Sequence, residues 1–315
     1  MNQIDLLLVS CFLFFYILPA NGQENGINKA GLHAAVPIDT VKKKHSALKI
    51  GLTFNSNSVF LARTDSVATP VFNTGLTYTL KSGIFFAGTV NYVPSRQFDK
   101  LDGGSLETGY NYEKHNFSGG VTLSKYFATF NSTQLISALD ATLGLDASYN
   151  IANIVTPSAH VDYALVKSGG NDFILTGGLA HDFTIEKPFS AKDNLSIAPA
   201  VHFNAGTQNF YNTYFIRQQT SLQGRLNARS KGKGKGVTAT TPTTTTTPVV
   251  TNVNKFQVLA YEFSVPVSYT NRKFAAEFTP VYAIAVHKTD DNGTNTFYLP
   301  NSSVFYFHFA LSYAF

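Results

Sequence analysis

Two side chains with acid–base chemistry lie two positions apart in the sequence, His160 and Asp162. On an extended strand this spacing places them on one face, where the carboxylate could orient the imidazole for base catalysis or the pair could contribute to a metal site. A polar interior that holds hydrogen-bonded histidines and carboxylates explains the pair more simply. His181 is a further isolated candidate, and no serine is spaced with it as a nucleophile would be. We therefore predict no catalytic residue, no metal site and no cofactor.

The elements that must position these residues are strands, because apolar and polar residues alternate with a period of two from His45 onward. Soluble strands usually have about five or six residues, whereas a tilted strand that crosses a membrane needs about nine to eleven. Many of the alternating segments exceed ten residues. Twelve of them are predicted, near 45–56, 70–80, 84–94, 104–113, 116–127, 135–149, 154–167, 172–186, 195–209, 256–270, 273–288 and 303–315.

The polar face of these strands separates a soluble sandwich from a membrane barrel, since both have one apolar face. Here that face carries glycine and small polar residues, as at Gly51, Gly75 and Gly144, and these suit the inside of a narrow closed barrel. Aromatic residues near the strand ends match the interfacial girdles of outer-membrane barrels. Alternate connections between the strands are short, as expected for periplasmic turns. The sequence predicts an all-β fold, a transmembrane antiparallel up-and-down β-barrel of about 12 strands.

Acids predominate among the ionisable residues that strand parity points into this barrel. Besides Lys49, the predicted lumen lining consists of Glu107, Glu113, Asp140, Asp146, His160, Asp162, Asp182, His202, Glu262, Glu277, His287 and His308. An acid-leaning lumen favours the passage of cations or small neutral polar solutes.

The composition excludes other classes of protein. Only 14% of the residues are charged, against roughly 25% in a typical soluble domain. No run of about 20 apolar residues is present, which argues against a polytopic helical membrane protein. The net charge of +5 resides in one segment, because 212–254 holds six cations and no carboxylate. These cations are Arg217, Arg225, Arg229, Lys231, Lys233 and Lys235.

Segment 212–254 is also of low complexity, with a Lys-Gly repeat and a Thr/Pro run, and we predict that it is an extracellular loop. Its cations could attract lipopolysaccharide phosphates or another anionic surface polymer. A variable loop under little constraint is the alternative interpretation.

The N-terminal residues 1–22 are predicted to be a signal peptide. Leu6 to Leu18 is apolar apart from Ser10 and too short to span a bilayer, and Ala20 and Gly22 fit the small-x-small cleavage pattern. Residues 23–44 then form a periplasmic leader, and 45–315 form the barrel. The only cysteine, Cys11, lies in the signal peptide, so the exported chain has no disulfide.

The C-terminal strand carries a family resemblance. Its alternating Phe307, Phe309, Leu311, Tyr313 and Phe315, with the long strands before it, resemble a bacterial outer-membrane β-barrel with its C-terminal assembly signal. The resemblance implies the outer membrane as location, with its lipids, lipopolysaccharide and the barrel-assembly machinery as partners and no nucleic acid. Strands that contain proline, 195–201 and 263–267, are similar to those of uncharacterised barrels from Bacteroidota, and proline predicts bulges or strand ends there.

Three functions remain open for such a barrel. The leading hypothesis is a narrow pore or uptake channel for small polar solutes or cations. The alternative is a non-conducting surface barrel that acts through its outer loops as an adhesin, anchor or assembly partner. The third is a lipid-modifying enzyme. Strand parity predicts that His181 faces lipid near the inner end of its strand, and the sequence lacks a recognisable nucleophile beside it. The oligomeric state is left open.

Overall fold

The computed structural model describes residues 46–64, 68–96, 100–129, 132, 134–210, 213, 254–286 and 303–315. The predicted signal peptide 1–22, the leader 23–44 and nearly all of loop 212–254, with its six cations, lie outside these residues, as does His287. No helix in the part of the chain that is described has the length and hydropathy needed to cross a bilayer.

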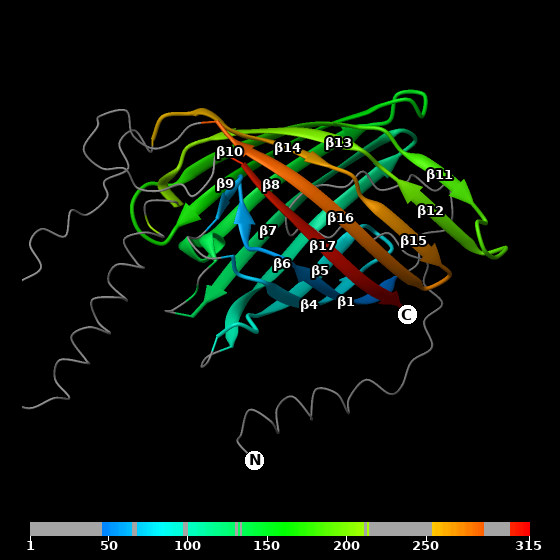
Figure 1. The fold of residues 1–315 in the computed structure, drawn as a ribbon, viewed down its shortest axis with the longest axis horizontal. Helices are drawn as coiled ribbons and strands as arrows, with labels where there is room; N and C mark the ends of the chain where they lie inside the picture. The colour runs from blue at the N-terminus through cyan, green and yellow to red at the C-terminus, as the bar shows by residue number, and fades with distance from the viewer. Residues whose placement is uncertain are drawn as a thin grey trace, which may run out of the picture.

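Twelve antiparallel wall strands form a closed barrel, as predicted (Figure 1). Three of these wall strands are each divided into two elements. In chain order the wall consists of β1 (Ala47–Asn55), β4 (Val71–Thr79), β5 (Ile84–Tyr92), β6 (Leu101–Lys114), β7 (Phe117–Ala128), β8 (Leu139–Tyr149), β9 (Thr156–Val166), β10 (Asp172–Ala180) with β11 (Phe183–Glu186), β12 (Asp193–Ile197) with β13 (Ala200–Gly206), β14 (Gln257–Ser264) with β15 (Val267–Asn271), β16 (Phe274–Ala285) and β17 (Ser303–Ala314).

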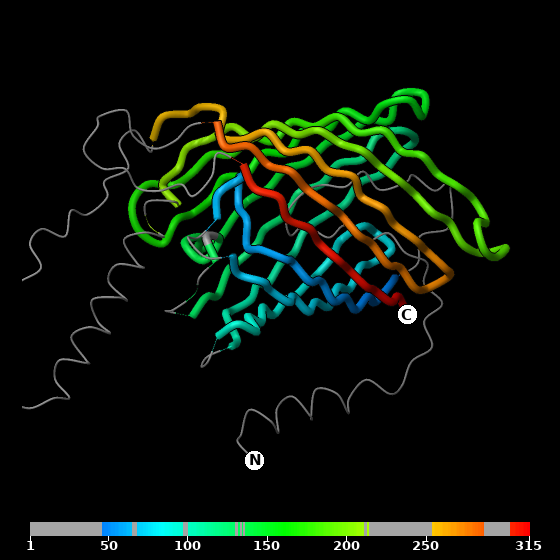
Figure 2. The backbone as a smooth tube through the Cα atoms, in the orientation of Figure 1, coloured from blue at the N-terminus to red at the C-terminus, as the bar shows by residue number. Residues whose placement is uncertain are grey.

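The first and last strands close the wall. Along the barrel, each wall strand pairs with its neighbour in sequence, and β1 pairs with β17 in a register that joins Leu52 to Leu311 and Phe54 to Phe309. The blue β1 and the red β17 run side by side in Figure 2. Closure joins the first and last strands, so their backbone N–H and C=O groups find partners without water. At the turn end β11 pairs only with β12 among the described strands.

The two ends of the barrel differ. We call the end with the short connections 80–83, 115–116, 150–155, 187–192 and 272–273 the turn end, and the opposite end the loop end. The C-terminus lies at the turn end (Figure 1). A short hairpin of β2 (Val59–Phe60) and β3 (Arg63–Thr64), together with the 3-10 helix η1 (Leu135–Ala138), belongs to the loop end.

Proline explains why three wall strands are divided. Pro199 and Pro266 stand at two of the breaks, and a proline has no N–H with which to return a ladder hydrogen bond. The opposite hydrogen bonds persist, so the register continues across each break: His181 N to Pro199 O at 3.1 Å, Ala198 N to Pro266 O at 2.9 Å and Val265 N to Pro280 O at 3.2 Å. The expectation of strand ends at these prolines is confirmed.

The wall has an apolar outward face and a small, polar inward face. Large apolar side chains at alternate positions are exposed, for example Leu52, Leu76, Phe86, Leu106 and Leu143. The residues between them are small or polar and mostly buried or half-buried. The alternation of the sequence therefore becomes an outer apolar surface around a polar interior, as a membrane barrel requires.

One glycine is required by its backbone conformation. Gly103 has a φ of +137°, and an added Cβ would overlap the carbonyl oxygen of Phe127 on β7. We expect Gly103→Ala to lower the free energy of unfolding by about 1–3 kcal/mol. Gly51→Ala is the matched control, because its Cβ would be 3.7 Å from the nearest atom, Leu311 O. Urea unfolding in lipid vesicles measures both; equal losses would contradict the strain argument.

Candidate functional site

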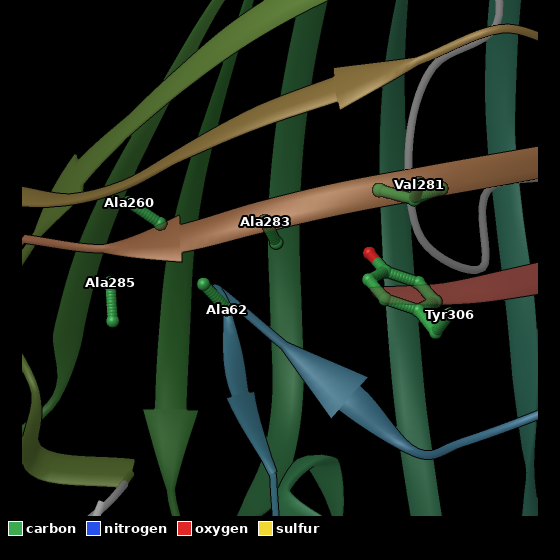
Figure 3. Close-up of a cluster of buried hydrophobic side chains, with 6 residues drawn as sticks. All are labelled: Ala62, Ala260, Val281, Ala283, Ala285 and Tyr306. Carbon is green, nitrogen blue, oxygen red and sulfur yellow. The ribbon is translucent and has the colours of Figure 1, made fainter. Parts of the chain in front are cut away.

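The β2–β3 hairpin lies inside the barrel at its loop end. On one side Ala62 packs into an apolar cluster from the walls β14, β16 and β17, shown in Figure 3. The wall residues of this cluster are Ala260, Val281, Ala283, Ala285 and Tyr306. The small alanines leave room for the hairpin backbone, so the chain between β2 and β3 can approach the wall closely.

On its other side the hairpin reaches the opposite wall. Phe60 and Leu61 pack against a second cluster, which contains Phe210 and the β8, β9 and η1 residues Ala138, Leu139, Ala164 and Val166. The rings of Phe60 and Phe210 meet edge to face with their centroids 4.9 Å apart. Because β8 and β9 lie across the ring from β16 and β17, the hairpin spans the lumen from wall to wall.

Polar contacts fix the hairpin in this position. Arg63 is 1% exposed and donates through Nη2 to Gln208 Oε1 at 2.7 Å and through Nη1 to Leu61 O at 2.8 Å. The backbone N–H of Ala62 donates to the carboxylate of Glu262. A buried guanidinium without hydrogen bonds would be strongly unfavourable, so these contacts make the hairpin a defined constriction.

A buried carboxylate organises the segment that carries Gln208. Asp172 is fully buried at the loop end of β10. Its oxygens accept hydrogen bonds from Thr207 Oγ1 at 2.6 Å, Asn209 N at 2.7 Å and Phe210 N at 2.7 Å. Asp172 thereby turns the chain inward after β13, and places Gln208 and Phe210 where the hairpin meets them.

Between the hairpin and the turn end, the inward side of the wall carries most of the predicted lumen residues. His160 Nε2 and Asp162 Oδ2 are 2.8 Å apart, and Asp146 stands opposite His160 in the register of β8 and β9. Both side chains of the His160–Asp162 pair keep some exposure, 14% and 26%. Water therefore reaches this part of the lumen.

The other predicted lining residues lie on the same inward side. Glu107 accepts from Ser105 Oγ, Glu277 from Thr279 Oγ1 and Asp182 from Ser196 Oγ, at 3.3, 2.9 and 2.6 Å. The remaining described members are Glu113 opposite Ser118, His202 opposite Glu262, and His308, which contacts Asn55.

Asp140 departs from the prediction. The register of β8 shifts between Leu139 and Ala141, so Asp140 is the extra residue of a β-bulge. Its carboxylate pairs with the ammonium of Lys125 at 2.7 Å, and both side chains are more than 40% exposed. Lys125 stands opposite Ala141 on the outward face. Alternation predicted an inward carboxylate, and the bulge turns it away from the lumen.

The residues of the predicted assembly signal alternate outward along β17. Across the closing seam Phe309 stands opposite Phe54, and Leu311 stands opposite Leu52. The ring of Phe307 lies between those of Phe54 and Phe278, with centroid separations of 6.0 and 5.6 Å. Within the described ranges, no group of three or more His, Cys, Asp or Glu side chains is arranged to hold a metal ion.

The sequence did not identify the residues that close the loop end. Arg63 contacts Gln208, and Asp172 contacts the backbone of Asn209 and Phe210. These residues are far apart in the sequence and meet only in the folded chain. One local signal was present: Phe60, Leu61 and Ala62 form an apolar run inside a connection, which is unusual for a solvated loop.

Among known protein families, curated proteins and solved structures, only solved structures match this chain. No protein-family model matches the chain, and no curated protein matches it. Among solved structures, the KdgM porin is 8% identical with a TM-score of 0.42 and covers 85% of this chain and 99% of its own. LpxR from Salmonella typhimurium is 11% identical with a TM-score of 0.41, covering 85% and 99%. An outer membrane channel from Pseudomonas putida F1 is 10% identical with a TM-score of 0.41, covering 93% and 100%.

The pairing of its wall strands makes the chain a closed twelve-stranded antiparallel β-barrel. It has an apolar outer surface and a polar lumen that a hairpin crosses at one end. An origin in Bacteroidota stays a prediction from the sequence.

Proposed function

We propose that this chain is a bacterial outer-membrane barrel that conducts cations or small neutral polar solutes through a narrow lumen, with the β2–β3 hairpin as its constriction. The observation that carries the proposal is the contrast along the lumen. Toward the turn end the inward face is acidic, polar and reached by water, whereas at the loop end the hairpin crosses from wall to wall. Acidic residues lining a pore favour cations over anions.

The proposal includes the orientation and partners of the barrel. The turn end faces the periplasm and the loop end faces outward, since long connections are typical of the outer side. Lipids and lipopolysaccharide surround the apolar outward face. The barrel-assembly machinery reads the outward aromatic residues of β17 and the Phe315 that follows it, after a signal peptide has exported the chain. The six cations of loop 212–254 attract lipopolysaccharide phosphates, and neither a catalytic step nor a cofactor is needed.

Conductance of the purified protein in planar bilayers tests the pore. We expect small, cation-selective single-channel events. In a KCl gradient, the reversal potential should lie closer to the equilibrium potential of K⁺ than to that of Cl⁻. Combined replacement of Asp146, Asp162 and Glu277 by the matching amides should reduce this selectivity. Asp140→Asn is the control, because its carboxylate faces outward and its loss should leave the reversal potential unchanged. Anion-selective events in the unaltered protein would contradict the proposed lumen.

A second candidate is a non-conducting surface barrel, which acts through its outer loops as an adhesin, anchor or assembly partner. The dense packing of the loop end favours it, since Phe210, Leu139 and Arg63 are at most 1% exposed. Absence of channel events both in the unaltered protein and in a variant with 57–64 shortened would select this candidate over the pore.

A further inference from the structure

A shallow apolar notch lies on the outward face of the wall, where β10 and β13 meet the end of the turn 150–155. Its volume is about 360 Å³, and it is lined by Val155, Leu179, Pro199, Val201, the alanines beside them and His181. His181 follows the parity of Leu179 and Phe183, both of which are exposed outward. It is therefore a polar side chain in an apolar, outward-facing site, which is unusual for a surface in contact with lipid.

The ring of His181 is held in one orientation. Its Nδ1 contacts the carbonyl oxygen of Ile154 in the turn between β8 and β9, and its ring packs edge to face on Phe183 with centroids 4.1 Å apart. A carbonyl oxygen can only accept a hydrogen bond, so Nδ1 carries the proton. In the neutral ring Nε2 is then an acceptor.

The backbone adds a second acceptor to the same place. His181 N donates to Pro199 O, but Pro199 has no N–H to return to the carbonyl of His181. The side chains that line the rest of the notch are apolar. A ligand that fits the notch therefore combines a hydrocarbon chain with a hydrogen-bond donor.

The position of the notch along the barrel limits which group of a lipid could donate this hydrogen bond. Val155, which lines it, ends the turn 150–155, and the outward ring of Tyr149 marks the interface on the neighbouring strand. With the membrane location given under Proposed function, this interface would set the notch where acyl chains join their backbone, below the headgroups. An ester at this depth offers only acceptors, whereas an amide offers an N–H.

We propose that the notch binds an acyl lipid whose chain is amide-linked, with the apolar chain against Leu179 and Val201 and the N–H donated to His181. This inference rests on the membrane location given under Proposed function, but not on conduction. A purely structural role for His181, tying the turn at Ile154 to β10, predicts no choice among lipids.

Tryptophan fluorescence can measure that choice, because the chain contains no tryptophan. Phe183→Trp places a single reporter beside His181, and Leu52→Trp places a matched reporter on the outward face of β1. Each variant is reconstituted with dibrominated sphingomyelin, phosphatidylcholine or phosphatidylethanolamine. The first two share a headgroup and differ in that sphingomyelin has an amide with a neighbouring hydroxyl whereas phosphatidylcholine has only esters, and phosphatidylethanolamine has its donor in the headgroup. Quenching by the bromines gives the relative binding constants of the lipids at each reporter.

We expect about a fivefold preference for sphingomyelin at position 183, the ratio given by one hydrogen bond of about 1 kcal/mol. The ratio should fall to about one in the added His181→Phe background and at position 52. No preference at 183, or a preference that survives His181→Phe, would overturn the proposal. So would a preference for dibrominated phosphatidylethanolamine without one for sphingomyelin, since its donor lies in the headgroup. Quenching at neither position would refute the membrane location as well.

Discussion

Replacement of Arg63 by alanine is expected to increase ion flow through the barrel. The variant loses the hydrogen bond to Gln208 that holds the hairpin across the lumen, and the bond to Leu61 O within the hairpin itself. Hydrogen bonds to a charged group contribute about 1.5–3 kcal/mol each. Every 1.4 kcal/mol of lost hairpin binding shifts the equilibrium between docked and undocked hairpin about tenfold. Single-channel recording should therefore show larger or more frequent openings.

A matched substitution separates hairpin release from a simple loss of charge. Lys125→Ala also removes one cation from the loop-end half of the barrel, but Lys125 is outward-facing and paired with Asp140. Its conductance should equal that of the unaltered protein. Circular dichroism and heat-modifiable migration on gels confirm that both variants fold. Folded Arg63→Ala with unaltered channel events would contradict the assignment of the hairpin as the constriction.

Replacement of Asp172 by alanine is expected to produce the largest loss of stability. Thr207 Oγ1 and the backbone N–H groups of Asn209 and Phe210 would lose their acceptor in a buried site. Unsatisfied buried donors cost about 1–3 kcal/mol each, and Phe210 would lose its fixed position against Phe60. We expect the free energy of unfolding in urea to fall by about 3–5 kcal/mol, allowing for partial relaxation.

Asp140→Ala serves as the comparison for Asp172. It removes a carboxylate from the neighbouring part of the wall, but that carboxylate is exposed and makes one surface ion pair. Such pairs contribute about 0–1 kcal/mol. A loss for Asp172→Ala no larger than that for Asp140→Ala would show that the loop end does not depend on the buried carboxylate.

The wall of the barrel could be predicted from the sequence because its signal is local. Each wall strand alternates residue by residue, so the segments predicted at 84–94 and 116–127 correspond to β5 and β7 within two residues. The proline breaks were also predictable, since the missing N–H of Pro199 or Pro266 is a property of the residue itself.

The interior of the loop end could not be predicted in the same way. Arg63 and its partner Gln208 are 145 positions apart in the sequence, and neither residue type indicates burial by itself. Asp140 shows a different limit: parity counts assume an unbroken ladder, and one bulge reverses the face of the residue it contains. The contact of His160 with Asp162 was predictable, because it lies within one strand.

The notch at His181 depends both on a local sequence signal and on contacts between distant parts of the chain. Parity predicted that His181 faces lipid, and the structure adds the turn at Ile154 and the proline on the opposite strand. Those two neighbours come from other parts of the chain. The carbonyl of Ile154 decides which ring nitrogen can accept a hydrogen bond, and Pro199 has no N–H to donate to the carbonyl of His181.

The position of the hairpin also constrains the order in which the protein assembles. Residues 57–64 follow directly on the first wall strand, yet the walls that receive Ala62 belong to β14, β16 and β17 at the other end of the chain. Contacts between residues so distant in sequence are slow to form. The segment among the first to be synthesised is therefore among the last to reach its native place, because β14, β16 and β17 must first be in position to receive it.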